Sequence, residues 1–141
     1  TDHSPAPPAI KALDTGDFTK AWGGISSLQY LISAAWTSLK DQLTLDTFIP
    51  LITKKPAEFL GINKQKGSIE IGMDADLTVW TPEAQFEVAK ANNQHRHKIS
   101  PYIGRTLFGK INATFVNGME VFNQHLLSNQ KHGQWILKNK K

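Results

Sequence analysis

The hydrophobic periodicity of this chain changes once, near residue 62, and that change constrains the fold more than any other feature. Before it, apolar residues recur at spacings of three and four, which is typical of helices that bury one face. Beyond residues 63–67, apolar and polar residues alternate in short runs, which is typical of strands. We therefore expect an α/β chain whose helices come first and whose strands follow.

Three helices are expected in the first part. The first follows Gly23-Gly24, and its apolar stripe is Ile25, Leu28, Ile32, Ala35, Trp36 and Leu39. The second begins at Thr44, whose side chain can cap it, and Pro50 should kink or interrupt it. The third is a short helix over residues 56–60, ended by Gly61.

Short strands are expected in the second part, over residues 68–72, 76–80, 86–88, 110–116 and 119–122. Thr81-Pro82 should close the second of them. Asn117-Gly118 is a strong signal for a tight hairpin turn between the last two. Residues 89–108 are polar and are expected to be irregular.

The first five residues have no initiator methionine and place an aspartate and a histidine directly before a proline-rich stretch. Proline fixes φ, so residues 4–17 are expected to form a long loop. Asp2 then has the position of a catalytic aspartate at the tip of a strand. We expect the chain to be the C-terminal piece of a larger enzyme, and the piece alone to be inactive.

Composition excludes several classes of protein. Without cysteine the chain forms no disulfide and offers no thiolate metal ligand. No segment approaches the roughly 18 apolar residues of a membrane-spanning helix. The net charge of +4 is concentrated at residues 138–141, 54–55 and 64–66, with no basic stripe interleaved with aromatics. A solvated basic tail is therefore favoured over a nucleic-acid surface.

Several stretches together resemble the cyclic amidohydrolase superfamily. They are residues 1–5, 16–18 and 20–29, then 66–77, and finally 100–104 and 109–118. The resemblance covers the chain up to about Phe122. Residues 2–5 and 20–29 favour the allantoinases over dihydropyrimidinases or dihydroorotases, whereas the strand motifs are common to the superfamily.

The resemblance implies an α/β fold, a (β/α)8 TIM barrel with a small β-sandwich built from both chain ends. Residues 1–62 would form the C-terminal end of the barrel, with its last strand tip and helices. Residues 63–122 would form part of the sandwich, and residues 123–141 a basic tail.

The resemblance also implies a site with two divalent metal ions, expected to be zinc. Hydroxide and a carboxylated lysine bridge the metals, and four histidines and one aspartate complete the ligands. This chain would supply only the aspartate, Asp2. The lysine and the ligating histidines are not in this chain.

Elementary chemistry assigns Asp2 a second role beside that of metal ligand. Barrel active sites gather at the C-terminal ends of strands. A carboxylate there can take the proton of the attacking water and hand it to the leaving nitrogen. Side chains of a strand alternate between faces, so Ser4 returns to the site and can hydrogen-bond the ring of the substrate. His3 points the other way and is expected to have a packing or supporting role.

Two further pairs of residues have the spacing of metal ligands. His95 and His97 lie beside Arg96 and Lys98, which disfavour a cation, so a surface loop is expected. Asp74 and Asp76 are expected to belong to a turn, because no third carboxylate follows at calcium-loop spacing.

The sequence thus predicts part of a cytoplasmic, homo-oligomeric (tetrameric) allantoinase that hydrolyses the cyclic amide of allantoin to allantoate. No nucleic acid or membrane partner is expected. A dihydropyrimidinase or hydantoinase, a metal-free scaffold protein of the dihydropyrimidinase-like type, and a separate non-catalytic module remain as alternatives.

Overall fold

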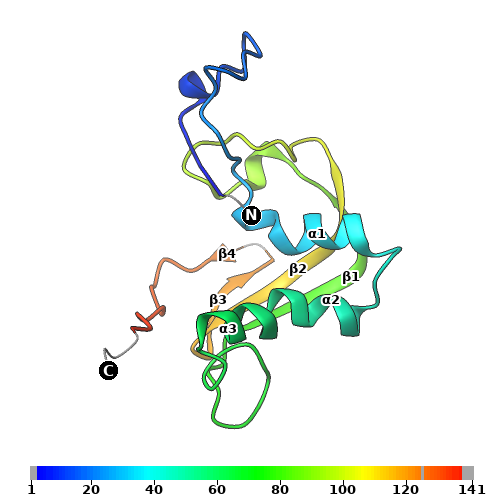
Figure 1. Cartoon of the computed structure of the whole chain (residues 1–141), viewed down its shortest axis with the longest axis vertical. Coiled ribbons are helices and arrows are strands. Elements are labelled where there is room, and N and C mark those ends of the chain that lie inside the picture. The colour runs from blue at the N-terminus through cyan, green and yellow to red at the C-terminus, as the bar shows by residue number, and fades with distance from the viewer. Residues whose placement is uncertain (1–2, 125, 138–141) are drawn as a thin grey trace. The chain divides into compact units, whose positions relative to one another are not determined.

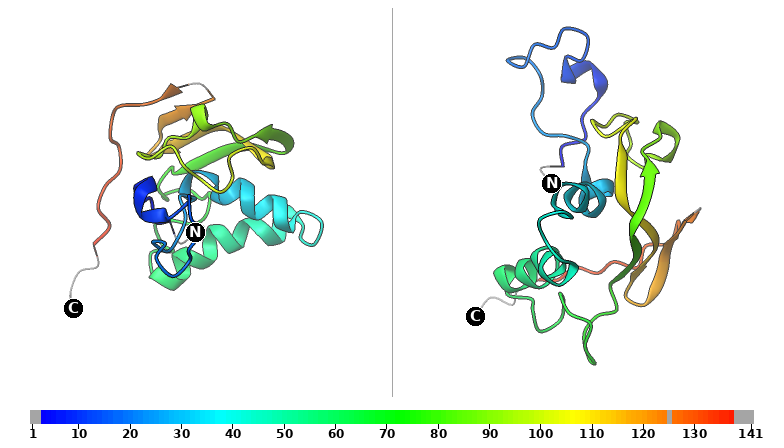
Figure 2. Two further views of the ribbon diagram at one scale, coloured as in Figure 1. Left: turned by 90° about the horizontal axis from the view of Figure 1, so that it is seen from above. Right: turned by 90° about the vertical axis from the view of Figure 1, so that its right-hand side faces the viewer.

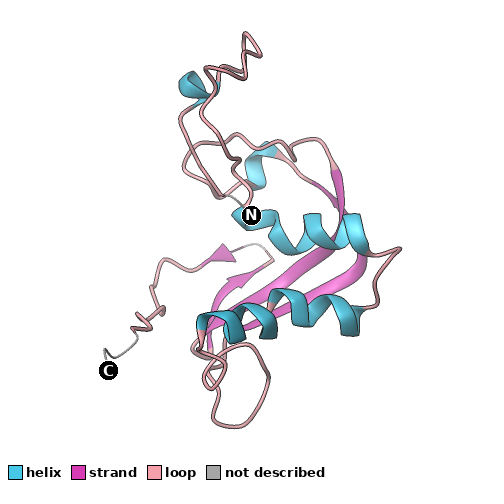
Figure 3. Cartoon of the chain, viewed as in Figure 1, coloured by secondary structure: helices cyan, strands magenta, loops and turns pink. Residues whose placement is uncertain are grey.

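The computed structural model describes residues 3–124 and 126–137, and in them the α-helices precede the strands. The α-helices are α1 (Leu31–Leu39), α2 (Leu45–Ile52) and α3 (Lys54–Leu60). The strands are β1 (Leu77–Glu87), β2 (Thr106–Val116), β3 (Met119–Asn123) and β4 (Leu126–Leu127) (Figure 1). Short 3-10 helices are η1 (Pro8–Lys11), η2 (Leu28–Tyr30) and η3 (Lys90–Asn92) (Figure 3). The expected α/β character and order of elements are confirmed.

The chain divides into two compact units, each made of two stretches. The first unit is Thr1–Leu39 with Pro82–Lys110, and the second is Lys40–Thr81 with Ile111–Lys141. The sheet has the order β1-β2-β3-β4, and β3 is antiparallel to both of its neighbours. β4 falls in the stretch expected to be a tail. No helix among the described residues is long and apolar enough to cross a bilayer.

In the first unit, α1 is held to the strand backbone by polar side chains. The bonds are Ser33 Oγ to Gly109 O (2.7 Å), Trp36 Nε1 to Pro82 O (3.1 Å) and Phe108 N to Thr37 Oγ1 (2.8 Å). Beside them, Tyr30, Val88 and Leu107 form a small buried cluster. Because these hydrogen bonds are directional, they prevent α1 from sliding along the strands.

The expected strand break at Thr81-Pro82 is wrong, because β1 runs without interruption to Glu87. The separate strand expected over 86–88 is therefore the end of β1. Proline is tolerated in an edge strand, where its missing N–H faces away from the ladder. β1 is such an edge, and the carbonyl of Pro82 accepts its hydrogen bond from Trp36.

In the second unit, α2 begins where expected but is not interrupted. Thr44 occupies the N-cap position with extended backbone, yet its Oγ1 lies 3.1 Å from Thr47 Oγ1 and makes no capping bond to the helix backbone. Pro50 lies inside α2, which continues to Ile52. Pro50 has no backbone N–H, so α2 lacks only the hydrogen bond from residue 50 to the carbonyl of Asp46. This carbonyl lies in the exposed first turn.

The predicted ends of two other elements are confirmed. α3 closes at Gly61, which has φ 69° in the left-handed region. Asn117 and Gly118 have φ 51° and 77°, as a two-residue hairpin turn requires, and Val116 pairs with Met119 across it.

The strand expected over residues 68–72 does not form. The alternating isoleucines there are exposed, Ile69 by 88% and Ile71 by 108%. Alternating apolar and polar residues form a strand only where another strand supplies hydrogen bonds. No strand of the described chain pairs with this stretch.

Residues 66–76 are instead organised by one ammonium group. Lys66 Nζ forms ion pairs with Asp74, at 2.7 Å, and with Asp76. Asp76 Oδ1 also accepts the N–H of Asn117, at 2.9 Å, which connects this loop to the hairpin. Although burial acts to raise it, the pKa of Asp76 is lowered by the hydrogen bond from Lys66. Asp74 and Asp76 thus stabilise the loop that follows the turn at residues 71–72.

Lys66→Met should destabilise the chain by about 1–2 kcal/mol, between the values typical of exposed and buried ion pairs. The substitution leaves two neighbouring carboxylates without their common cation. Lys64→Met is the matched control, because Lys64 is exposed and should change stability by less than about 0.5 kcal/mol. Chemical denaturation of both variants measures this, and equal stabilities would contradict it.

Candidate functional site

The predicted site falls at the start of the first unit, where residues 3–4 lie beside residues 22–28. Asp2 lies outside the described residues. Ser4 is half-buried, and its N–H donates to Ile25 O at 2.9 Å. Its Oγ accepts the indole N–H of Trp22 at 2.9 Å. The hydroxyl of Ser4 keeps its own proton, with which it can donate to a further acceptor.

His3 makes the other contacts between these two segments. It forms an isolated parallel bridge with Ile25. Its Nδ1 accepts the N–H of Ser27 and the N–H of Leu28, both at 3.1 Å. Ile25 was expected to begin the first helix. It is extended instead, because its carbonyl is engaged by Ser4, and the helical path starts only at η2.

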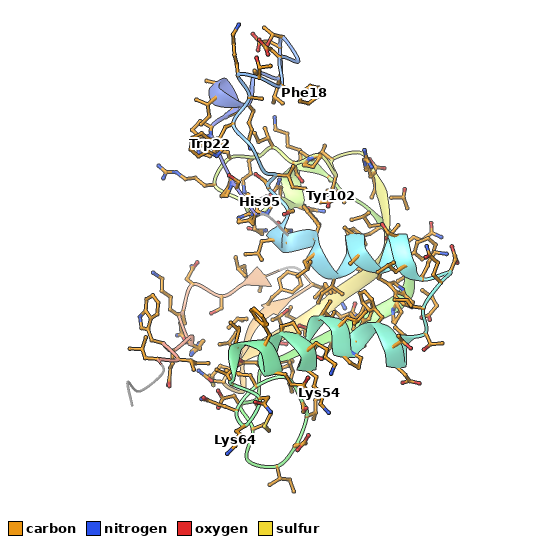
Figure 4. All side chains as sticks on the ribbon, in the orientation of Figure 1. Phe18, Trp22, Lys54, Lys64, His95 and Tyr102 are labelled. Carbon is orange, nitrogen blue, oxygen red and sulfur yellow. The ribbon has the colours of Figure 1, made fainter. Side chains whose placement is uncertain are left out.

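A lysine fixes the turn that precedes this segment. Lys11 Nζ donates to three successive carbonyls, those of Trp22 (3.0 Å), Gly23 (3.0 Å) and Gly24 (2.7 Å). The loop between them stands away from the rest of its unit (Figure 2), and Phe18 in this loop is 93% exposed (Figure 4). The lysine thus closes the base of the loop expected from the prolines, and holds Gly23-Gly24 in one conformation.

Gln29 and Ser26 join the same segment to the loop after η3. Gln29 Nε2 donates to Asn92 O at 2.9 Å, and Gln29 Oε1 accepts the N–H of Gln94 at 2.7 Å. Ser100 Oγ donates to Ser26 O at 2.8 Å. Residues 25–30 are therefore bound on one side by the chain start and on the other by residues 92–100.

His95 lies in this loop, where a surface position was expected, and it is half-buried. Its ring centroid is 5.1 Å from that of His3 and 6.1 Å from that of Tyr30. Both ring nitrogens are buried, and no hydrogen-bond partner reaches them among the described residues. Burial lowers the pKa of His95, and the charges of His3 and Lys98 lower it further. The neighbouring Arg96 and Lys98 suggested a surface loop, and the sequence carries no information on this distant ring contact.

The polar atoms around His95 form a cluster with unused hydrogen-bonding capacity. Among the described residues, no partner reaches Ser26 Oγ, Tyr30 OH or Asn93 Nδ2, all of which are buried. Burial also raises the pKa of the Tyr30 phenol, which keeps it protonated as a donor. Figure 4 shows His95 and Tyr102 close to the start of α1. The cluster can therefore donate to, or accept from, a polar group that reaches this side of the segment.

An open depression of about 540 Å³ lies over these histidines. Its lining residues are His3, Pro5, Pro7, His95, Arg96 and His97. In the described part of the chain, no three histidine, aspartate or glutamate side chains come together as a metal site would need. The depression is polar and weakly cationic, as suits a neutral or anionic polar ligand.

Comparison with known proteins places these residues in a family. A profile of the amidohydrolase family matches residues 2–121. Allantoinase of Arabidopsis thaliana is 42% identical over 127 residues, which is 88% of this chain and 25% of that protein. Allantoinase of Streptomyces avermitilis is 38% identical over 122 residues, covering 86% of this chain and 26% of that protein. The chain thus spans about a quarter of the length of these relatives.

Solved structures of hydantoinases share the fold. The D-hydantoinase (dihydropyrimidinase) of a Thermus species superposes with a TM-score of 0.82 over 94% of this chain and 29% of its own, at 23% identity. The L-hydantoinase (dihydropyrimidinase) of Arthrobacter aurescens gives a TM-score of 0.71 at 28% identity, over 78% of this chain and 25% of its own.

Acidification should destabilise the first unit through His95. Its pKa in the folded chain lies below the ordinary value of 6.5, so the unfolded chain binds its proton first. Its contribution to stability is therefore complete above about pH 6.5 and is lost as the pH falls towards the folded pKa. The melting temperature of the wild type should drop more between about pH 7 and pH 5 than that of His95→Gln.

His97→Gln, a change of the next histidine in the same loop, serves as the control and should keep the wild-type pH dependence. Equal pH dependence of the His95→Gln variant and the wild type would contradict the account of His95.

Proposed function

Because the chain belongs to the amidohydrolase family, we propose that it is part of an enzyme that opens the hydantoin ring of allantoin by hydrolysis of a cyclic amide, with allantoate as product. The observation that carries this proposal is the level of identity. The relatives named allantoinase reach 42% and 38% identity over 88% and 86% of this chain. The fold shared with the hydantoinase structures does not by itself decide the substrate, because one fold can carry several activities.

We propose further that residues 1–62 complete a (β/α)8 barrel and that residues 63–122 belong to a β-sandwich beside it. The superposition on hydantoinases supports this arrangement at the level of the fold. In a barrel, substrate groups are contacted from the C-terminal ends of strands. The segment of His3 and Ser4, extended and directly before a loop, has the local structure of such an end.

In this reaction the side chain of Asp2 moves a proton. Water adds to the carbonyl carbon of the ring amide, and Asp2 accepts the proton that the water releases. The C–N bond then breaks as Asp2 returns this proton to the ring nitrogen, so that the carboxylate is regenerated. Ser4 binds the ring through its hydroxyl proton, with its oxygen oriented by the indole N–H of Trp22.

We also propose that the whole protein holds two divalent metals, expected to be zinc, with Asp2 as one ligand. When bound, such metals acidify the attacking water. The described residues do not fit a metal pair by themselves, because they bring no three suitable side chains together. The roles that we propose for this chain are therefore proton transfer by Asp2 and binding of the ring by Ser4.

Hydrolysis of dihydropyrimidines or of hydantoins other than allantoin is the second candidate function. It is favoured by the superposition on the L-hydantoinase, at 28% identity. Both candidates use the same proton transfer and differ in the ring that the pocket accepts.

The whole protein should hydrolyse allantoin with a kcat/KM at least about tenfold above that for dihydrouracil, since one or two lost polar contacts have an effect of this size. Asp2→Asn should lower kcat by about 10²–10⁴-fold, the usual contribution of acid–base catalysis. An amide keeps the size of the side chain but cannot accept the proton. Asp14→Asn, at an exposed position of the following loop, is the matched control and should keep wild-type activity.

Steady-state kinetics with both substrates and metal analysis of each variant measure these effects. Faster turnover of dihydrouracil would reject the allantoin assignment. An Asp2→Asn enzyme within about threefold of wild type would reject Asp2 as the proton carrier, given the magnitudes above.

A further inference from the structure

The imidazole of His3 satisfies two backbone donors at the start of a helical segment that is distant in sequence. Ser27 is the N-cap of η2, and Leu28 is its first residue. N–H groups at such a position have no partner within the helix and must find one elsewhere. Here both point to the single lone pair of His3 Nδ1, at 3.1 Å each.

This arrangement determines the tautomer of the ring. A nitrogen that accepts hydrogen bonds carries no proton, so in neutral His3 the proton is on Nε2. Nδ1 is occupied by two amides and Nε2 is a donor, so neither nitrogen of His3 offers a lone pair to a metal in this state. The expectation that His3 supports its surroundings agrees with these bonds.

The plane of the ring is also fixed. The ring of His95 packs at 5.1 Å with an interplanar angle of 55°, and the ring of Tyr30 packs on His95 in turn. Tyr30 belongs to the buried cluster with Val88 and Leu107. A rotation of His3 about its side-chain bonds would therefore break two hydrogen bonds and disturb a packed core.

We propose that His3 is a positioning residue, which fixes the backbone next to Asp2 by accepting the amides of Ser27 and Leu28. It touches no reacting atom. The proposal rests on the proposed function of Asp2, because the placement of a proton carrier matters only if it carries a proton. A displacement of about 1 Å at a reacting group can cost about 10²-fold in rate.

Three substitutions of His3 in the whole protein separate this role from general packing. The amide oxygen of His3→Asn takes the place of Nδ1, so it can accept the same two N–H groups. In His3→Gln the acceptor is displaced by one bond, to the place of Nε2, and His3→Ala has none. His3→Asn and His3→Gln thus carry the same amide group and differ in size by one methylene, while the position of the acceptor changes.

We expect kcat to fall by about 10–10²-fold in His3→Gln and His3→Ala, with KM and metal content nearly unchanged, and to stay within about threefold of wild type in His3→Asn. The second readout needs no substrate. Amide hydrogen exchange of the peptide that contains Ser27 and Leu28 should be faster in His3→Gln and His3→Ala, and close to wild type in His3→Asn.

The proposal is overturned if His3→Asn is as impaired as His3→Gln in both readouts, or if exchange at Ser27 and Leu28 is the same in all variants. It is also overturned if exchange changes but kcat does not. If a His3→Gln protein fails to fold, wild-type kinetics and exchange in His3→Asn still support it. Failure of the proposed function is distinguishable, because a whole protein without allantoin turnover would still show the expected exchange pattern.

Discussion

Two amide hydrogen bonds to one nitrogen, His3 Nδ1, join the start of this chain to the segment that leads into α1. The arrangement around the candidate site depends on them. Without this acceptor, the N–H groups of Ser27 and Leu28 would lose this hydrogen bond, and the loss costs more at Ser27, which is buried, than at Leu28, which is 58% exposed. The N–H of Ser4 also donates to the carbonyl of Ile25, so the side chain of His3 and the backbone directly after it are both bonded to residues 25–28.

The position of η2 is in turn determined by the strands, to which α1 is hydrogen-bonded. Ser33 and Thr37 bond α1 to the backbone of β2, and Trp36 bonds it to β1. α1 continues directly from η2, so a helix anchored to strands determines where Ser27 and Leu28 present their N–H groups. A chain of directional bonds thus runs from the strands of the first unit through α1 to the side chain of His3.

The sequence predicted those features that are decided locally. Gly61 and Asn117-Gly118 adopt positive φ, which is a property of these residue types, and the hairpin and helix end are found where expected. Features decided by distant partners were not predictable. Pro82 does not end a strand because it lies at a sheet edge, residues 68–72 have no strand of the described chain to pair with, and His95 contacts the ring of His3 from the chain start. The role of His3 could be expected from the alternation of strand side chains, but its two amide donors could not.

A crystal structure of the whole protein would test the central claim most directly, because it would show which atoms His3 Nδ1 contacts. The account predicts that the nitrogens of Ser27 and Leu28 both lie within about 3.5 Å of Nδ1, at hydrogen-bond distance, with the ring of His95 packed on that of His3. A His3 ring turned so that Nδ1 binds a metal ion or solvent, with the two amides bonded elsewhere, would contradict it.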